Sequence, residues 1–332
     1  PKNGALATAT VAFDPSGAIS VAVSSVPQGQ GHRTVLAQVV ADVFQMDPLE
    51  VAVATEHDTA KDPWTIASGN YASRFAGAVA GATHTAAVRL RERLTVIAAA
   101  DLNVPPEDVA YGNGRIFATG NPDNSVPLGR SAAKAHWSPL SIPDAAGAGL
   151  RETAFWNMPE LAEPDEGDRI NSSGAYGFIF DFCGVEIDPV TCAVRIDKYV
   201  TMHDAGRLLN PMLANGQIRG GFAQGLGAAL LEELSYAPDG SFQTGTLADY
   251  LAPTVMEVPE LTILHDQSPS PFTPLGAKGL GEGNCMSTPV CIANAVADAI
   301  GGEVTTLPLT PSRLADFLLP DEPASSAPAI AP

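Results

Sequence analysis

The sequence is poor in basic residues, in aromatic residues and in cysteine. Its 18 lysine and arginine residues face 37 aspartate and glutamate residues, which gives a formal net charge of −19 at pH 7. A chain this acidic repels phosphate backbones, which excludes nucleic acid as an expected partner. No apolar run approaches the roughly 18–20 residues that span a bilayer, so we expect a soluble protein without a membrane span. With 332 residues, 45% of them hydrophobic, the chain can form a substantial core in one or two domains.

The four cysteines have spacings that fit neither a zinc site nor an iron–sulfur cluster: Cys183, Cys192, Cys285 and Cys291. We expect free thiols, which suits a reducing cytoplasm. Cys183 and Cys192 flank a predicted hairpin. If Ile187 lies opposite Cys192, then Cys183 lies opposite Ile196, which disfavours a disulfide. The first residues show no secretory-signal pattern, so cytoplasmic localisation is expected.

Apolar periodicity predicts the same order of elements twice. The first half shows a β-hairpin over residues 7–24, a helix over 34–44, a strand over 50–55 and a helix over 73–100. After an irregular stretch over 119–170, the second half shows two strands within 176–200, a helix over 216–234, a strand over 260–265 and a helix over 284–300. We therefore predict an α/β (α+β) fold of two similar α/β subdomains, with mixed sheets and packed helices. The predicted boundaries are 1–160, 161–319 and a disordered tail over 320–332. Chance agreement in element order is the alternative.

A glycine-rich loop over residues 276–283, GAKGLGEG, leads into a predicted helix. Its glycines permit positive φ and close approach of backbone N–H groups to an anionic cofactor. The loop is neither a P-loop nor a dinucleotide fingerprint. Glu282 lies at the helix N-terminus, where the dipole favours its ionised form and burial opposes it, so it is a candidate general base. The alternative is an ordinary helix-capping loop with a solvated glutamate.

Three other segments precede predicted helices and offer amides or polar side chains to a ligand. They are QGQGH at 28–32, SGNYASR at 68–74 and DAGRLLNP at 204–211, the last followed by Gln217. Ser73 and Arg74 have the hydroxyl, amide and guanidinium groups that bind phosphate. Each segment is equally compatible with a plain polar turn or helix cap, and a lone histidine such as His32 more often packs than catalyses. The sequence has no GxSxG motif and no zinc-protease spacing, so hydrolase chemistry finds no support.

In order and spacing, five segments resemble the second half of the large subunit of the molybdenum hydroxylases, the xanthine dehydrogenase and aldehyde oxidase family. They are QGQGHRT at 28–34, EHDTAKDPWTIASGNYASR at 56–74, HDAGRLLNPMLANGQIRGGFAQGLGAALLEE at 203–233, DYLAPT at 249–254 and GAKGLGEG at 276–283. The resemblance implies a molybdenum ion held by the dithiolene of molybdopterin, in bacterial members usually the cytosine dinucleotide form. It also implies that no protein side chain binds the metal.

The resemblance assigns Glu282 as the general base, which removes a proton from the molybdenum-bound hydroxyl before the oxygen attacks an electron-poor carbon. Hydride then passes to the sulfido ligand, a division of labour typical of cofactor enzymes. With the glycine loop, the matching segments give the following candidate cofactor-binding residues: Gln28, Gly29, Gln30, Gly31, His32, Thr34, Ala72, Ser73, Arg74, Asp204, Asn210, Gln217, Lys278, Gly279 and Gly281.

The sequence departs from the family in several places. Phe75 stands where many relatives have a small hydroxyl residue, and Ala205 where many have cysteine. The glycine-rich and arginine-bearing segments of the family's first half do not occur, nor do iron–sulfur or flavin motifs. The resemblance therefore implies a split subunit or fragment whose partners are a chain carrying that first half, a [2Fe-2S] subunit and an FAD subunit. Isolated, the chain should expose an apolar interface and bind cofactor poorly.

The function implied is that of a catalytic subunit that inserts water-derived oxygen into an electron-poor carbon of an N-heteroaromatic substrate. Three alternatives remain at this level. The first is an aldehyde oxidoreductase of the same family, since much of the substrate pocket should come from the missing half. The second is a non-catalytic binding or assembly module with the same fold. The third is an unrelated α/β protein whose glycine loops are only turns.

Overall fold

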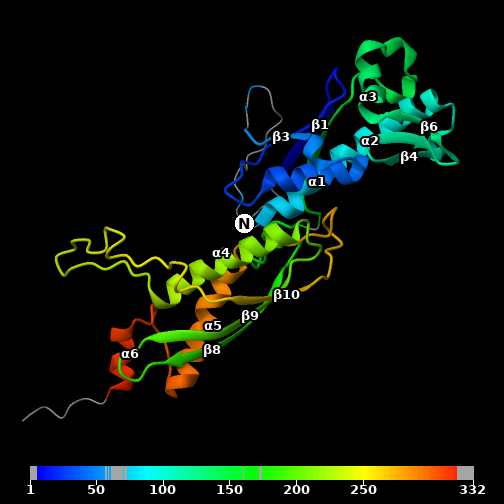
Figure 1. Ribbon diagram of the computed structural model, residues 1–332. Coiled ribbons are helices and arrows are strands. Elements are labelled where there is room, and N and C mark those ends of the chain that lie inside the picture. Colours follow the sequence, from blue (N-terminus) through cyan, green and yellow to red (C-terminus); the bar gives the residue numbers. More distant parts are fainter. Residues whose placement is uncertain are drawn as a thin grey trace, which may run out of the picture. The chain divides into compact units, whose positions relative to one another are not determined.

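The computed structural model describes residues 6–56, 58, 60, 70, 73–159, 161–171 and 174–319 (Figure 1). The chain divides into two compact units. Unit 1 comprises Pro1–Gly177, Asp204–Ala214 and Gln267–Leu280, and unit 2 comprises Phe178–His203, Asn215–Asp266 and Gly281–Pro332. We predicted two consecutive subdomains with a boundary after residue 160. Unit 1 is not continuous in sequence, because it runs to Gly177 and also includes residues 204–214 and 267–280. The tail predicted over 320–332 lies outside the described residues.

Unit 1 is built on a mixed sheet with the strand order β3-β2-β1-β7. The predicted hairpin is present, because β1 (Ala7–Phe13) pairs antiparallel with β2 (Ile19–Val23). Asp14 fixes its turn: Oδ1 accepts hydrogen bonds from the amides of Ser16 and Ala18. The other strands are β3 (Val51–Ala54), parallel to β2, and β7 (Arg151–Trp156), antiparallel to β1.

Two helices supply most of the unit 1 core. They are α1 (His32–Phe44) and α2 (Ala80–Leu102), and α2 follows a π-helical turn over Phe75–Val79. Leu36, Val40 and Phe44 recur every four residues on α1 and are fully buried. Leu90, Leu94 and Ile97 of α2 are buried in the same cluster.

The stretch over 119–170 that we predicted to be irregular contains regular elements. It holds β6 (Asn121–Pro127), α3 (Leu128–Trp137) and β7. Strand β6 completes a three-stranded sheet of order β4-β5-β6, whose other strands, β4 (Val109–Gly112) and β5 (Arg115–Ala118), precede residue 119. The prediction was wrong here because the two prolines of β6 argue against a strand in the sequence. The strand forms nonetheless because β6 lies at the edge of its sheet, where proline is tolerated. The start of α3, after Pro127, has no side-chain cap, so the usual sequence signal is missing.

Unit 2 repeats the order hairpin, helix, strand, helix. Its sheet has the order β10-β9-β8, the counterpart of β3-β2-β1 in unit 1, so the predicted fold of two similar α/β subdomains is confirmed. The elements are β8 (Phe178–Ile187), β9 (Val194–Asp204), α4 (Pro211–Leu230), β10 (Leu261–Asp266) and α5 (Gly283–Ile300), followed by α6 (Pro311–Leu318). The core contains Tyr199, whose ring meets that of Phe222 edge-on at 4.6 Å.

The helix predicted over 216–234 begins and ends earlier than expected. Asn210 caps α4, because its Oδ1 accepts a hydrogen bond from the amide of Leu213 at 2.9 Å, and Pro211 suits the first helical position. At the other end the amide of Glu232 bonds the carbonyl of Gly227, which closes the helix at Leu230.

Candidate cofactor and catalytic site

In unit 1, the end of β9 and the glycine-rich loop run side by side. Gly206 and Ala277 form an antiparallel bridge, and the amide of Lys278 donates to the carbonyl of Ala205 at 2.8 Å. Gly206 has a φ of 62°, and a β-carbon there would lie 2.2 Å from the carbonyl oxygen of Gly276. Only glycine fits this position. The loop is thus fixed to the segment that carries the motif DAGRLLNP.

An ion pair stabilises this pairing. Lys278 Nζ lies 2.9 Å from Asp204 Oδ2, and the two side chains are only 9% and 13% exposed. Asp204 also accepts hydrogen bonds from the amides of Gly206 and Ser268, while the Ser268 hydroxyl bonds Oδ2. Burial alone would raise the pKa of Asp204, but Ser268, Lys278 and the two amides together hold it below its usual range. In this structure Lys278 thus joins the glycine loop to the end of β9.

The segment at Ser73 reaches the same loop. Ser73 has a φ of 51°, and its Oγ accepts a hydrogen bond from the amide of Leu280 at 3.3 Å. A β-carbon on Gly279 would lie 3.3 Å from Cβ of Ser73, so glycine allows the close approach. Arg74 follows at the start of the π-helical turn, and its Nη2 donates to the carbonyl of Leu6 at 3.3 Å. π-Helical turns are frequent at functional sites.

The segment QGQGH meets the start of α4. Gly31 has a φ of 78°, and a β-carbon there would lie 2.6 Å from Cδ1 of Leu213. Asn210 Nδ2 donates to Gln38 Oε1 at 3.0 Å, which ties the cap of α4 to α1. A β-carbon on Gly29 would meet open space. Among the described residues, no side chain caps the amides at the start of α1, so these donors are open to an anionic ligand.

His32 is the buried member of this segment. Its ring stacks on that of Phe75 with centroids 3.7 Å apart and planes 6° apart. Neither ring nitrogen meets hydrogen-bond geometry with a described residue. Burial lowers the pKa of His32 to about 4, and the nearby backbone of Ser25 only partly opposes this. The imidazole is therefore neutral at pH 7.

Acidification should destabilise the protein through His32. The unfolded chain takes up a proton near pH 6.5, but the folded state does so only near pH 4. The free energy of unfolding should therefore fall by up to about 3 kcal/mol between these values, relative to a variant without the imidazole. Urea unfolding of the wild type and His32→Leu at pH 7 and pH 4.5 measures the difference. An equal pH dependence in both proteins would contradict this assignment.

In unit 2, Glu282 directly precedes α5 and is exposed, with Gly283 as the first helical residue. A β-carbon on Gly283 would lie 2.1 Å from Cδ1 of Ile179 and 3.7 Å from Cε1 of His203. The side chain of Gln217 lies against Gly281, whose β-carbon would be 3.3 Å from Oε1. The exposed position of Glu282 leaves its carboxylate accessible to a reacting group.

A buried polar network holds the first turn of α5. Asn284 Nδ2 donates to Oγ1 of Thr201 at 3.2 Å, and Tyr199 donates to Oδ2 of Asp181 at 2.7 Å. Thr201 Oγ1 in turn lies 3.0 Å from His203 Nε2. Asp181 Oδ1 and Asn284 Oδ1 are buried and have no partner among the described residues. The network fixes the helix start that carries Glu282.

Replacing Asn284 with alanine should lower the free energy of unfolding by about 2 kcal/mol. The reason is that the buried hydroxyl oxygen of Thr201 no longer receives the hydrogen bond from Asn284 Nδ2. The matched control is Met286→Ala on the same helical turn, which is 71% exposed and should stay within about 0.5 kcal/mol of the wild type. Urea unfolding at pH 7 compares both with the wild type. Equal stabilities of the two variants would show that the network has no stabilising role.

The structure brings most of the sequence-predicted cofactor residues into unit 1. These are Gln28, Gly29, Gln30, Gly31, His32, Thr34, Ser73, Arg74, Asp204, Asn210, Lys278 and Gly279; Gln217, Gly281 and Glu282 belong to unit 2. Ala72 lies outside the described residues. Neither Ser268 nor the Asn284 network was predicted from the sequence. Polar residues at inward positions of β9, such as Thr201 and His203, were the available signal for the network.

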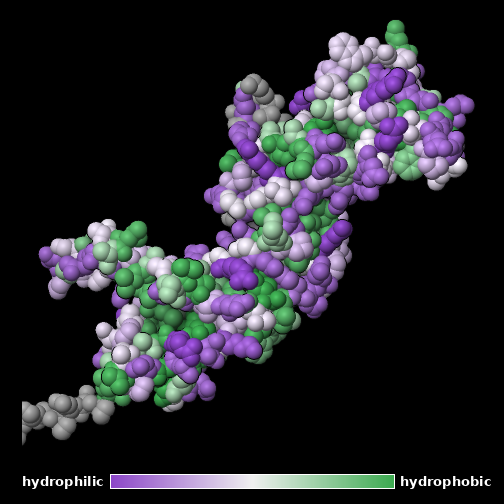
Figure 2. Space-filling view, in the orientation of Figure 1, coloured by the Kyte–Doolittle hydropathy of each residue, from purple (hydrophilic) through white to green (hydrophobic). Residues whose placement is uncertain are grey.

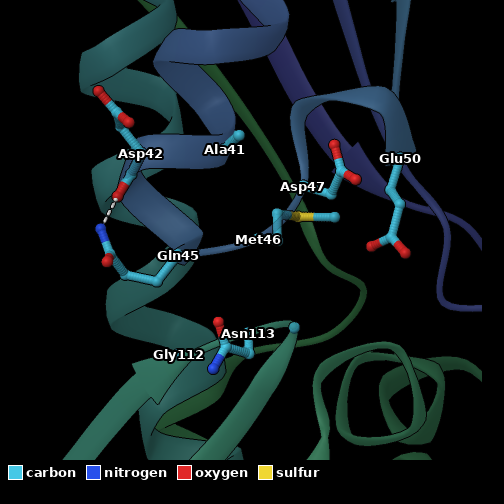
Figure 3. Close-up of a pocket in the computed structure, with 9 residues that line it drawn as sticks. Ala41, Asp42, Gln45, Met46, Asp47, Glu50, Gly112 and Asn113 are labelled. Atoms are coloured by element: carbon cyan, nitrogen blue, oxygen red, sulfur yellow. Dashed lines mark hydrogen bonds between the residues drawn. The ribbon is translucent and has the colours of Figure 1, made fainter.

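The pocket in Figure 3 lies elsewhere in unit 1. It has a volume of about 630 Å³ and is lined by Ala41, Asp42, Gln45, Met46, Asp47, Glu50, Gly112, Asn113 and Gly114. This is the C-terminal end of α1, about 20 Å along the helix from His32 at the N-terminal end. None of its lining residues belongs to the candidate site.

Comparisons with known proteins identify the family to which the fold and the motifs belong. A family model described as a molybdopterin cofactor-binding domain matches residues 1–259. The nicotine 6-hydroxylase large subunit of Paenarthrobacter nicotinovorans is 34% identical over 92% of this chain and 36% of the relative. The gamma subunit of the 6-hydroxypseudooxynicotine dehydrogenase complex of the same organism is 32% identical over 94% of this chain and 37% of the relative.

The crystal structure of quinoline 2-oxidoreductase from Pseudomonas putida 86 has a TM-score of 0.81 and is 34% identical, over 95% of this chain and 38% of that chain. This chain thus spans little more than a third of the length of these relatives. Within the part of the chain that the structure describes, no helix is long and apolar enough to cross a membrane. The fold, the assembled motifs and the family match over 1–259 together show that the chain belongs to the molybdenum hydroxylase family, through its molybdopterin cofactor-binding domain.

Proposed function

We propose that this chain is the part of a molybdenum subunit that binds the pterin cofactor and supplies the catalytic base of a hydroxylating dehydrogenase. The observation that carries the proposal is the meeting of four sequence motifs in unit 1. The glycine loop contacts Ser73 on one side and Gly206 on the other. Unit 1 ends within this loop at Leu280, and Glu282 follows two residues later in the chain.

The residues of unit 1 fit a pterin dinucleotide. The open amides at the start of α1 and the free space above Gly29 suit phosphate groups. The neutral His32 has a buried ring nitrogen that meets no described partner, which suits a polar ring edge of the ligand. We propose that residues 28–34, Ser73, Arg74 and Asn210 bind the cofactor, in its cytosine dinucleotide form. Asp204 and Lys278 position the glycine loop beside it.

When bound, the molybdenum cofactor supplies the two-electron oxidation. The chain's own contribution is the Glu282 carboxylate, which accepts a proton as the water-derived oxygen attacks the substrate carbon. Gly283 lets the helix start pack against Ile179, and the Asn284 network keeps the carboxylate in place.

The proposed substrate is an N-heteroaromatic ring, because relatives at 34% identity are named for nicotine and quinoline. The proposed partners are the rest of the molybdenum subunit, a [2Fe-2S] subunit and an FAD subunit. An apolar stripe on β8 supports a partner: Phe178, Phe180 and Phe182 are 61%, 60% and 68% exposed. The four free cysteines favour the reducing cytoplasm as the compartment.

The test is the loaded assembly, purified with its co-encoded subunits. We expect stoichiometric molybdenum, extractable pterin, and hydroxylation of quinoline or nicotine with oxygen from isotopically labelled water. Oxidation of benzaldehyde but of neither heterocycle would favour an aldehyde oxidoreductase instead. An assembly with molybdenum but no turnover on any substrate would favour a non-catalytic binding module, and one without pterin would contradict the proposal.

A further inference from the structure

We infer that residues 232–257, here called the arm, dock onto the part of the molybdenum subunit that this chain does not contain. The arm links α4 to β10 and is the extended yellow segment of Figure 1. All its residues are described, and they form neither helix nor strand. A connection of this length without regular structure is uncommon and is usually functional. The inference deepens the proposed function, on which it rests, by naming the surface that meets the partner.

The base of the arm is fixed to unit 2. Leu231 just before the arm and Val258 just after it pack against the unit 2 core. A β-carbon on Gly227 would lie 2.6 Å from Oε1 of Glu232 and 2.9 Å from Cδ of Pro253, so both ends of the arm approach α4 at one point. Arg313 of α6 donates to Glu233 at 3.1 Å. The arm therefore leaves the unit from a defined place.

Hydrogen bonds within the arm give it a definite conformation. The amide of Ala237 donates to the carbonyl of Ser241, and that of Gln243 to Ser235, both at 2.9 Å. Near the other end, the amide of Thr254 donates to the Glu257 carboxylate at 2.7 Å. A docking segment that is ordered before it binds loses less conformational entropy on association.

The arm presents its large apolar side chains to water. Leu247, Val255 and Met256 are 82%, 87% and 85% exposed. Leu234, Tyr236, Phe242 and Leu251 are also exposed. Figure 2 shows apolar surface on this segment among polar atoms. So many exposed apolar side chains on one ordered segment mark a surface that another protein surface covers.

The charge of the arm and the length of the relatives together identify the partner that covers the arm. The arm has five acidic residues, Glu232, Glu233, Asp239, Asp249 and Glu257, and no lysine or arginine. A second copy of a chain with a net charge of −19 would oppose it with like charge, so the fitting surface has apolar pockets rimmed by basic side chains. The relatives are almost three times as long as the region that they share with this chain. Nearly two-thirds of a molybdenum subunit is therefore left to cover the arm. The family segment DYLAPT at 249–254 lies in the arm.

The experiment compares two triple variants of the full chain, each co-expressed with the tagged complementary part of the molybdenum subunit from the same organism. L247S/V255S/M256S removes the arm's apolar contacts, and we expect its binding to weaken at least about tenfold. The matched control L49S/L140S/V190S changes side chains of 92%, 102% and 83% exposure outside the arm and should bind as the wild type does. Circular dichroism of each chain alone checks its fold. Hydrogen exchange should show arm amides protected in the wild-type complex.

Each outcome decides the inference. Wild-type binding by the arm variant, or equal loss in both triple variants, would overturn it. Loss of self-association in the arm variant, with binding to the complementary part unchanged, would assign the arm to a second copy instead. If the arm variant forms the complex as the wild type does and that complex retains molybdenum, the docking role of the arm is contradicted, but the proposed function is not. A wild-type chain that neither binds the complementary part nor takes up molybdenum contradicts the proposed function as well.

Discussion

Replacing Glu282 with glutamine should lower turnover of the loaded enzyme by about 10²–10⁴-fold, the range that general-base catalysis contributes. Glutamine keeps the size and hydrogen-bonding reach of the side chain but cannot accept the proton. Because Glu282 is exposed and precedes the first helical residue, the change should leave folding and molybdenum content intact. Steady-state kinetics normalised to molybdenum measure the effect.

The control for this substitution is Glu303→Gln, which changes another exposed glutamate of unit 2 beyond the end of α5. It should leave turnover unchanged. Wild-type turnover in the Glu282→Gln variant would remove Glu282 from the catalytic role. A loss of molybdenum in parallel with activity would instead give it a structural role in cofactor retention.

Replacing Asp204 with alanine should lower the free energy of unfolding by about 3 kcal/mol, because it leaves the largely buried Lys278 ammonium without its carboxylate. The loop pairing with residues 276–278 should loosen, and molybdenum content should fall with it. Urea unfolding and metal analysis measure the two effects. The double variant Asp204→Leu/Lys278→Met should recover part of the stability, since no unpaired charge remains buried.

The matched control is Asp197→Ala on the same strand, whose side chain is 63% exposed and should stay within about 0.5 kcal/mol of the wild type. The contribution of Asp204 also has a definite pH dependence. Its folded pKa lies below the value of about 3.9 in the unfolded chain, so its stabilisation is fully present above that pH. It is lost as the pH falls below about 4 towards the folded pKa. An Asp204→Ala variant with wild-type stability at pH 7 would contradict this role of the ion pair.

Local signals predicted the repeated elements well. The turn residues between β1 and β2, the apolar face of α1 and the long helix ending at Leu102 follow from periodicity and turn chemistry. The same rules failed over 119–170, where β6 depends on pairing with β5. The start of α4 was missed by five residues, although Asn210 and Pro211 were a readable cap.

The sequence by itself determined which classes of protein the composition excludes, the two α/β halves and the identity of the candidate residues. These depend only on residue type and on spacing along the chain. Only the tertiary structure decided that Asp204, Ser268 and Lys278 form one hydrogen-bonded cluster, that Ser73 meets the glycine loop, and that His32 is stacked and neutral. These contacts join residues far apart in the chain. Their energies arise from burial and from atoms within hydrogen-bond distance, and neither exists until the chain has folded.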